Sequence, residues 1–111
     1  METDMGNDIL GTLEQSVLYA ILRLRENAYG VTIQAEIKEA TGRALSFGAI
    51  YTTLERLENK GFINARLGEA TATRGGRAKR YVSVTGTGQA ALHRTERVMA
   101  ALNTDFGVAG A

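Results

Sequence analysis

The sequence predicts an α+β fold in which three helices precede a two-stranded hairpin and a fourth helix follows it. Apolar residues recur at helical spacing in four segments, whereas two short segments alternate as strands on either side of a glycine-rich stretch. The chain of 111 residues is 44% hydrophobic, which is enough for one modest core. We therefore expect a main domain at residues 9–85, a C-terminal helix at 86–103, and flexible tails at 1–8 and 104–111.

The first two helices are predicted from their apolar faces. The face of the first helix, which starts near Ile9, comprises Leu10, Leu13, Val17, Ala20, Ile21 and Leu24. Leu18 and Leu22 make this face wider than a small core needs, so its extra side is expected to contact another subunit. The second helix ends at Thr41-Gly42. Its inward residues are expected to be Val31 or Ile33, Ile37 and Ala40.

The third helix has the clearest local signals in the chain. Ser46 stands at the N-cap position, and Gly61 follows the last turn as a C′ glycine does. The apolar residues Ile50, Leu54 and Leu57 recur at i, i+4 and i+7. The opposite face is slim and polar, and comprises Ala49, Thr52, Thr53 and Arg56. Two short helices, the second narrow and polar outside, are typical of a helix-turn-helix.

A basic hairpin is predicted directly after this helix. Residues 62–67 and 79–84 alternate as strands, and 68–76 form the loop between them. Residues 66–85 contain five basic side chains and one acid, which is the electrostatic footprint of a polyanion contact. A solvated basic loop is the alternative interpretation of this segment taken alone. A helix-turn-helix followed by a basic hairpin is a winged helix-turn-helix, and Phe47 and Tyr81 are expected in its core.

The last helix is predicted to begin after Thr85 as its cap and to run to about Asn103. Its apolar residues are Ala91, Leu92, Thr95, Val98, Met99 and Leu102. We expect this face to lie outside the core and to pack on a partner chain. Residues 86–91 superficially match the G-x-G-x-x-A dinucleotide motif, but no second parallel strand can follow, so we interpret the glycines as a flexible start of the helix. Glycine there weakens the first turn by up to about 1 kcal/mol.

The residue inventory disfavours several classes of function. The absence of cysteine excludes disulfides, thiolate chemistry and cysteine metal sites, and the single histidine, His93, excludes a histidine-rich one. No serine or carboxylate has the partners of a catalytic site, so we expect no enzyme, no cofactor and no metal. No apolar run approaches the ~18 to 20 residues of a membrane span, and the expected location is the cytoplasm.

In this order, the elements resemble the PadR-like transcriptional regulators, winged-helix proteins of bacteria and archaea, and within them the subfamily with a single C-terminal helix. The matching segments are Leu10-Gly11-Thr12-Leu13-Glu14, Tyr29-Gly30-Val31, Ser46-x-Gly48-x-Ile50-Tyr51-x-x-Leu54-x-x-Leu57-x-x-x-Gly61-Phe62-Ile63, Gly75-Gly76-Arg77-Ala78-Lys79-Arg80-Tyr81 and Thr85-x-x-Gly88. The resemblance implies a repressor that binds a pseudo-palindromic operator in double-stranded DNA as a homodimer. Some family members release DNA on binding a small molecule, so a small-molecule effector is a candidate partner. The chain has no tryptophan, so the tryptophan-lined ligand pore of the multidrug sensors is not implied.

Two sets of site residues follow from these patterns. The expected DNA contacts are Ser46, Gly48, Ala49, Tyr51, Thr52, Thr53 and Arg56 on the third helix, and Arg74, Arg77 and Lys79 on the hairpin. The expected dimer interface comprises Leu10, Leu13, Val17, Leu92, Thr95, Val98, Met99 and Leu102. The alternative function is a winged helix that binds an acidic protein through its basic hairpin and does not bind DNA.

Overall fold

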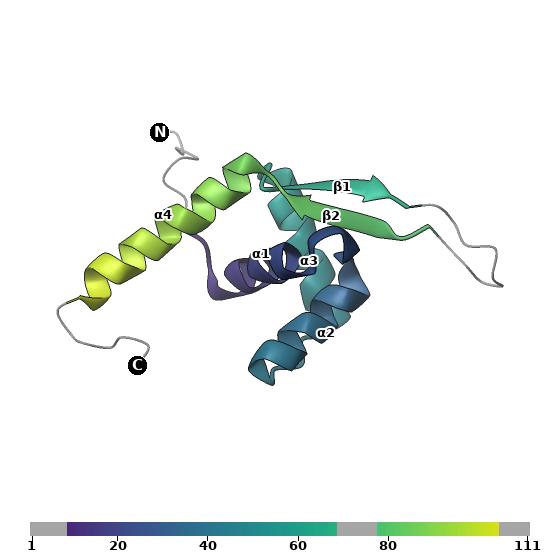
Figure 1. The fold of residues 1–111 in the computed structure, drawn as a ribbon, viewed down its shortest axis with the longest axis horizontal. Helices are drawn as coiled ribbons and strands as arrows, with labels where there is room; N and C mark the ends of the chain where they lie inside the picture. Colours follow the sequence, from purple (N-terminus) through teal and green to yellow (C-terminus); the bar gives the residue numbers. More distant parts are fainter. Residues whose placement is uncertain (1–8, 69–77, 105–111) are drawn as a thin grey trace.

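The computed structural model describes residues 9–68 and 78–104 of the chain. The elements in order are α1 (Thr12–Leu24), the short 3-10 helix η2 (Arg25–Asn27), α2 (Gly30–Thr41), α3 (Phe47–Asn59), β1 (Ile63–Leu67), β2 (Arg80–Val84) and α4 (Gly86–Asn103). The helices α1 to α3 form the body, the hairpin leaves it on one side and α4 on the other (Figure 1). The predicted α+β order of three helices, hairpin and fourth helix is confirmed within these residues.

The ends of the helices form where the local sequence predicts them. The Ser46 hydroxyl accepts a hydrogen bond from the Ala49 amide at 3.0 Å, and the Thr85 hydroxyl accepts one from the Gly88 amide at 3.0 Å. Gly42 and Gly61 follow α2 and α3 with φ of +78° and +80°, a left-handed conformation that side chains disfavour. Each helix of the helix-turn-helix therefore ends on a glycine.

One core joins α1, α2, α3 and the hairpin. Its largest fully buried apolar side chains are Val17, Leu18, Ile21, Ile33, Ile50, Leu57, Phe62 and Ile63. The prediction for Ala40 is wrong, because this residue is exposed and borders an open hollow beside Tyr19 and Arg23 of α1. The prediction for Phe47 is also wrong. This side chain is 42% exposed in the first turn of α3, where it stacks on Tyr51 instead of entering the core.

The hairpin is anchored at its base rather than freely attached. The strands are antiparallel, with Ile63 opposite Val84 and Ala65 opposite Val82, and these four residues face or border the core. The Val82 amide also donates to the Ala28 carbonyl at 2.9 Å, so β2 is bonded to the segment before α2 as well as to β1. The direction in which the strands leave the body is therefore fixed by the core.

The first half of α4 belongs to the core, which corrects the expectation that this helix packs only on a partner chain. Leu92 and Thr95 are 4% and 1% exposed, and the Thr95 hydroxyl accepts a hydrogen bond from the Leu10 amide at 3.0 Å. Leu10 and Val17 are likewise buried, at 4% and 0%. These four residues are covered by their own chain and therefore do not form an exposed dimer interface.

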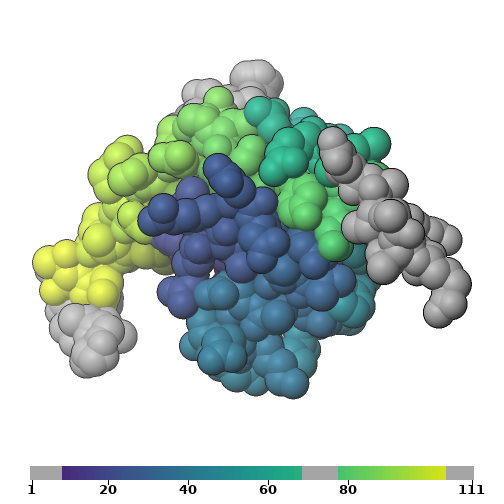
Figure 2. All heavy atoms as spheres, turned by 45° about the vertical axis from the view of Figure 1, so that its right-hand side comes forward, coloured from purple at the N-terminus to yellow at the C-terminus, as the bar shows by residue number. Residues whose placement is uncertain are grey.

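The second half of α4 leaves the body. In Figure 2 its yellow end projects past the blue helices. Met99 and Leu102 are 48% and 65% exposed there, and Val98 beside them is half-buried. These residues continue the stripe that Leu92 and Thr95 begin, so a single apolar face runs from the core into solvent.

The sequence predicts that Gly88 belongs to a flexible start of the helix, and this prediction is wrong. Gly88 is the point where α4 touches the hairpin. A Cβ atom on this glycine would lie 2.2 Å from the carbonyl oxygen of Phe62 and 2.9 Å from a methyl carbon of Val84. Gly86, two residues earlier, has no such neighbour within 4 Å. The close backbone approach at Gly88 therefore requires the absence of a side chain.

A hydrogen bond between Tyr19 and Glu96 links the middle of α1 to the middle of α4. Burial, together with the hydrogen bond and the negative charge of Glu96, raises the pKa of Tyr19 to about 12. The folded state thus favours the protonated phenol, whose ordinary pKa is about 10. Its stabilising contribution is complete below pH ~10 and is lost as the pH rises toward about 12.

We therefore expect Tyr19→Phe to lower the free energy of unfolding at neutral pH and to flatten its decline between pH ~10 and ~12. Urea unfolding at a series of pH values measures both effects. Tyr29→Phe is the control, because its ring packs edge-on against Tyr81 without a hydroxyl partner among the described residues. A Tyr19→Phe variant with the same alkaline decline as the wild type would contradict this role.

Candidate nucleic-acid interface

The third helix is held in place by contacts on both of its sides. In the turn before it, the Gln34 side-chain amide donates to the Leu45 carbonyl at 2.7 Å and so links α2 to the start of α3. At its end, Lys60 forms an ion pair with Glu14 of α1 at 3.1 Å. On the hairpin side, Glu58 pairs with Arg80 at 2.6 Å. These contacts connect α3 to α1 and to the hairpin, and the turn before it to α2, and leave its outward face uncovered by them.

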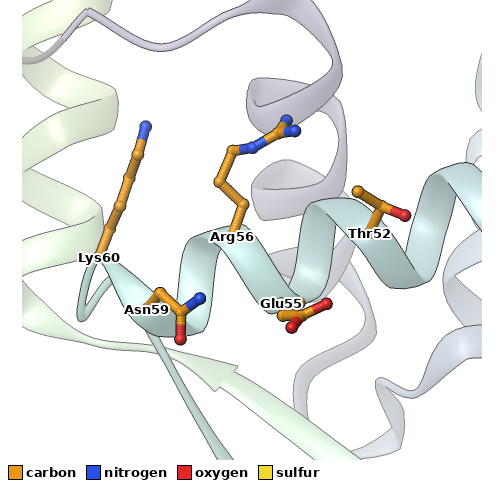
Figure 3. Close-up of a pocket in the computed structure, with 5 residues that line it drawn as sticks. All are labelled: Thr52, Glu55, Arg56, Asn59 and Lys60. Atoms are coloured by element: carbon orange, nitrogen blue, oxygen red, sulfur yellow. The ribbon is translucent and has the colours of Figure 1, made fainter.

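That outward face contains an open hollow of about 380 Å³. The residues that line it are Thr52, Glu55, Arg56, Asn59 and Lys60. Thr52, Arg56 and Lys60 project on one side of α3, and Glu55 and Asn59 on another (Figure 3). Thr52 and Arg56 are among the residues predicted from the sequence, whereas Glu55, Asn59 and Lys60 are not. Glu55 lies three residues after Thr52, and Asn59 and Lys60 lie three and four residues after Arg56. This helical spacing places them next to the predicted pair and could have been used to predict them.

Thr53 is not on this face, and its assignment as a DNA contact is wrong. Its side chain is 1% exposed, and its hydroxyl donates to the Ala49 carbonyl one turn earlier at 2.7 Å. The buried arc of α3 is wider than Ile50, Leu54 and Leu57 alone indicate, because Thr53 lies beside them on the helix. It packs against the body and cannot reach a ligand.

The N-terminal turn of α3 is accessible. Ser46 and Gly48 are exposed and Ala49 is half-buried, at the positive end of the helix dipole. The Ala49 amide is already bonded to the Ser46 hydroxyl, so the Gly48 amide is the one offered to a ligand. Tyr51 is 53% exposed, yet a Cβ atom on Gly30 would lie 2.3 Å from its hydroxyl oxygen. Its hydroxyl end therefore covers the start of α2, and its ring stacks on Phe47, while about half of the side chain remains exposed. This arrangement can receive an anion such as a phosphate.

The charges around α3 are unevenly paired. Glu14, which is not one of the predicted site residues, is 7% exposed and is neutralised by Lys60 across 46 positions of sequence. Arg56 is exposed and forms no ion pair with the described part of the chain. Lys79, at the base of the hairpin loop, is exposed with its ammonium 5.2 Å from the centre of the Tyr29 ring. Arg74 and Arg77 lie outside the described residues.

Neither a cluster of metal ligands nor a membrane-spanning helix is found among the described residues. No three histidine, aspartate or glutamate side chains in residues 9–68 and 78–104 gather as metal ligands would. His93 is exposed on α4. None of the helices described is both long and apolar enough to cross a membrane.

Comparisons with known proteins agree with this geometry. Residues 17–94 match the model of the transcriptional regulator PadR-like family. A PadR-like transcription factor from Bacteroides fragilis is 29% identical, with a TM-score of 0.71 over 89% of this chain and 91% of its own. A PadR-like regulator from Bacillus cereus is 25% identical, with a TM-score of 0.68 over 87% and 89%. No functionally curated protein shows significant similarity.

A further solved structure includes DNA. It is PadR from Bacillus subtilis in complex with operator DNA, 26% identical to this chain, with a TM-score of 0.64. The match covers 75% of this chain and 46% of that one, so it excludes more than half of the larger protein.

A capped, exposed third helix beside an antiparallel hairpin defines a winged helix-turn-helix protein. The family model matches residues 17–94, which are more than half of this chain of 111 residues. The chain therefore belongs to the PadR-like family of transcriptional regulators.

Proposed function

We propose that this protein is a sequence-specific repressor that binds a pseudo-palindromic operator as a homodimer. The observation that supports it best is the outward face of α3, where a capped N-terminus, Thr52 and the unpaired Arg56 lie on one accessible surface. The Bacillus subtilis relative with the same fold has been solved on operator DNA. The proposed location of the protein is the cytoplasm, because that compartment contains the chromosomal DNA of bacteria and archaea.

In the proposed complex, α3 lies in the major groove and its two ends have different roles. The Ser46 hydroxyl and the Gly48 amide donate to a backbone phosphate together with the Tyr51 hydroxyl, and Ala49, whose amide is bonded to Ser46, lies beside it. Thr52 and Arg56 reach base edges, since arginine pairs with guanine through two hydrogen bonds. Lys79, with Arg74 and Arg77, contacts phosphates or the minor groove beside the helix.

The homodimer is proposed to form through the exposed half of α4. Val98, Met99 and Leu102 extend the core stripe into solvent, and Leu13 of α1 is half-buried and available as well. Two copies joined in this way would present two α3 helices to successive major grooves about 34 Å apart. Release of DNA by a small-molecule effector remains a part of the proposal that rests on the family resemblance alone.

Replacement of Arg56 by alanine tests the DNA-binding surface. We expect Arg56→Ala to weaken binding to an operator selected from a random DNA pool by about fivefold or more. Fluorescence anisotropy at two salt concentrations measures the affinity and its salt dependence. If Arg56 contacts phosphate instead of a base, the log–log salt slope becomes shallower by about 0.9 and random DNA is affected equally.

Arg97→Ala is the matched control for this experiment. Arg97 is exposed on the side of α4 opposite its apolar stripe, so its loss removes the same charge at a distance from α3. Its operator affinity should stay within about twofold of the wild type. If the wild-type protein shows no salt-sensitive DNA binding below about 100 μM, the regulator proposal fails and the protein-interaction alternative replaces it.

A further inference from the structure

Glu55 is an unpaired carboxylate in the middle of the outward face of α3. Its side chain is exposed, and it lies between Thr52 and Asn59 along the helix. It forms no hydrogen bond or ion pair with residues 9–68 and 78–104. It also borders two hollows beside α3, the one that Arg56 lines and another of about 180 Å³ next to Tyr51.

Glu58, the other acidic residue of α3, has an ion-pair partner. Glu58 is half-buried and its carboxylate is 2.6 Å from the guanidinium of Arg80, so its charge is neutralised within the chain. Glu14, at the far side of the helix end, is neutralised by Lys60. Of the three carboxylates that border α3 in the described structure, Glu55 alone points to solvent with its charge uncompensated.

An uncompensated carboxylate is costly on a surface that approaches DNA, because the phosphates repel it. It is favourable only where a hydrogen-bond donor meets it. In the major groove the donors are exocyclic amino groups, and the acidic side chains pair with N4 of cytosine. A phosphate-binding surface without sequence preference would gain nothing from this residue.

We propose that Glu55 determines operator specificity by accepting a hydrogen bond from the N4 amino group of a cytosine in the major groove. This inference rests on the proposed function. Glu55 and Arg56 project from different sides of α3 (Figure 3), so they address different base pairs. The half-site should therefore contain a cytosine selected by Glu55 at a position separate from the guanine selected by Arg56.

The test is selection from a random DNA pool by the wild type and by Glu55→Gln, followed by titration of the selected and random duplexes. Glutamine has the same length but pairs with adenine instead of cytosine. We expect the variant to bind random DNA severalfold more tightly, because one repulsive charge is removed. We also expect the ratio of selected to random affinity to fall at least about fivefold and the cytosine preference to change to adenine.

Glu39→Gln is the control, since Glu39 is exposed on α2 and its replacement removes the same charge away from the α3 face. It should leave the selected sequence unchanged. If Glu55→Gln selects the same bases as the wild type and gains affinity for all DNA equally, Glu55 is only a solvent-exposed charge and the inference is overturned. A wild type that enriches no sequence and shows no salt-sensitive binding overturns the proposed function together with this inference. The first failure is seen in the variant and the second in the wild type, so the two are distinguishable.

Discussion

Alanine at Gly88 is expected to lower the free energy of unfolding by about 3 kcal/mol, whereas alanine at Gly86 should raise it by up to about 1 kcal/mol. Both glycines lie in the first turn of α4, so the intrinsic helix propensity favours alanine at both positions. At Gly88 the new Cβ would lie 2.2 Å from a backbone oxygen of Phe62, which cannot move aside without shifting β1. At Gly86 it would meet nothing within 4 Å.

Thermal and urea unfolding of the two variants measure this difference. For a domain of this size, about 3 kcal/mol corresponds to a fall in Tm of about 10 °C or more. Because the same methyl group is added two residues apart, composition and propensity cannot explain effects of opposite sign. A Gly88→Ala variant as stable as the wild type would mean that α4 does not approach the hairpin as closely as the structure shows.

Replacement of both Met99 and Leu102 by glutamate is expected to convert the proposed dimer to a monomer and to lower operator affinity by about 10²- to 10⁴-fold. The large effect arises because two linked recognition helices bind one palindrome with high effective concentration, and a monomer loses this advantage. The fold should survive, since Met99 and Leu102 are 48% and 65% exposed in the single chain. Light scattering measures the mass, and operator titration measures the affinity.

Ala101→Glu is the control, because it adds a carboxylate to the same exposed end of α4 but away from the apolar stripe. It should leave the mass and the operator affinity unchanged. A wild type that is a clean monomer at micromolar concentration, or a Met99→Glu/Leu102→Glu variant with the mass of the wild type, would refute the role of this helix.

The attachment of α4 to the body determines how far apart the two α3 helices would lie in the proposed dimer. Three separate contacts hold the helix to the body: Gly88 on Phe62, Thr95 on the Leu10 amide and Tyr19 on Glu96. Its exposed half therefore leaves the body in a fixed direction. If two copies join through that half, the separation of their α3 helices is set by the fold of each chain rather than by a flexible linker.

Local features of the fold could be predicted from the sequence because they depend on residues within a few positions of one another. The caps at Ser46 and Thr85, the C′ glycines at Gly42 and Gly61, and the alternation of the two strands all have this character. Exposure of Thr52 and Arg56 likewise follows from helical periodicity alone. These predictions are confirmed.

Contacts between distant residues could not be predicted in the same way. The ion pair between Glu14 and Lys60 spans 46 positions, and neither residue is distinctive in a sequence of ordinary composition. Thr53 has the size and polarity of a surface residue, and only the packing of α3 on the body shows that it is buried. Periodicity identifies a face of a helix but does not identify its neighbour.

By itself, the sequence determined that this chain is a helix-turn-helix with a basic hairpin and a further amphipathic helix, because spacing and caps are local properties. Only the tertiary structure decided that the apolar stripe of α4 is divided between two environments, with Leu92 and Thr95 in the core and Met99 and Leu102 in solvent. It also decided that Gly88 marks a backbone contact and that Glu55 has no partner among the described residues. The physical reason is that burial and charge pairing depend on which surfaces meet in space, and sequence neighbours do not specify this.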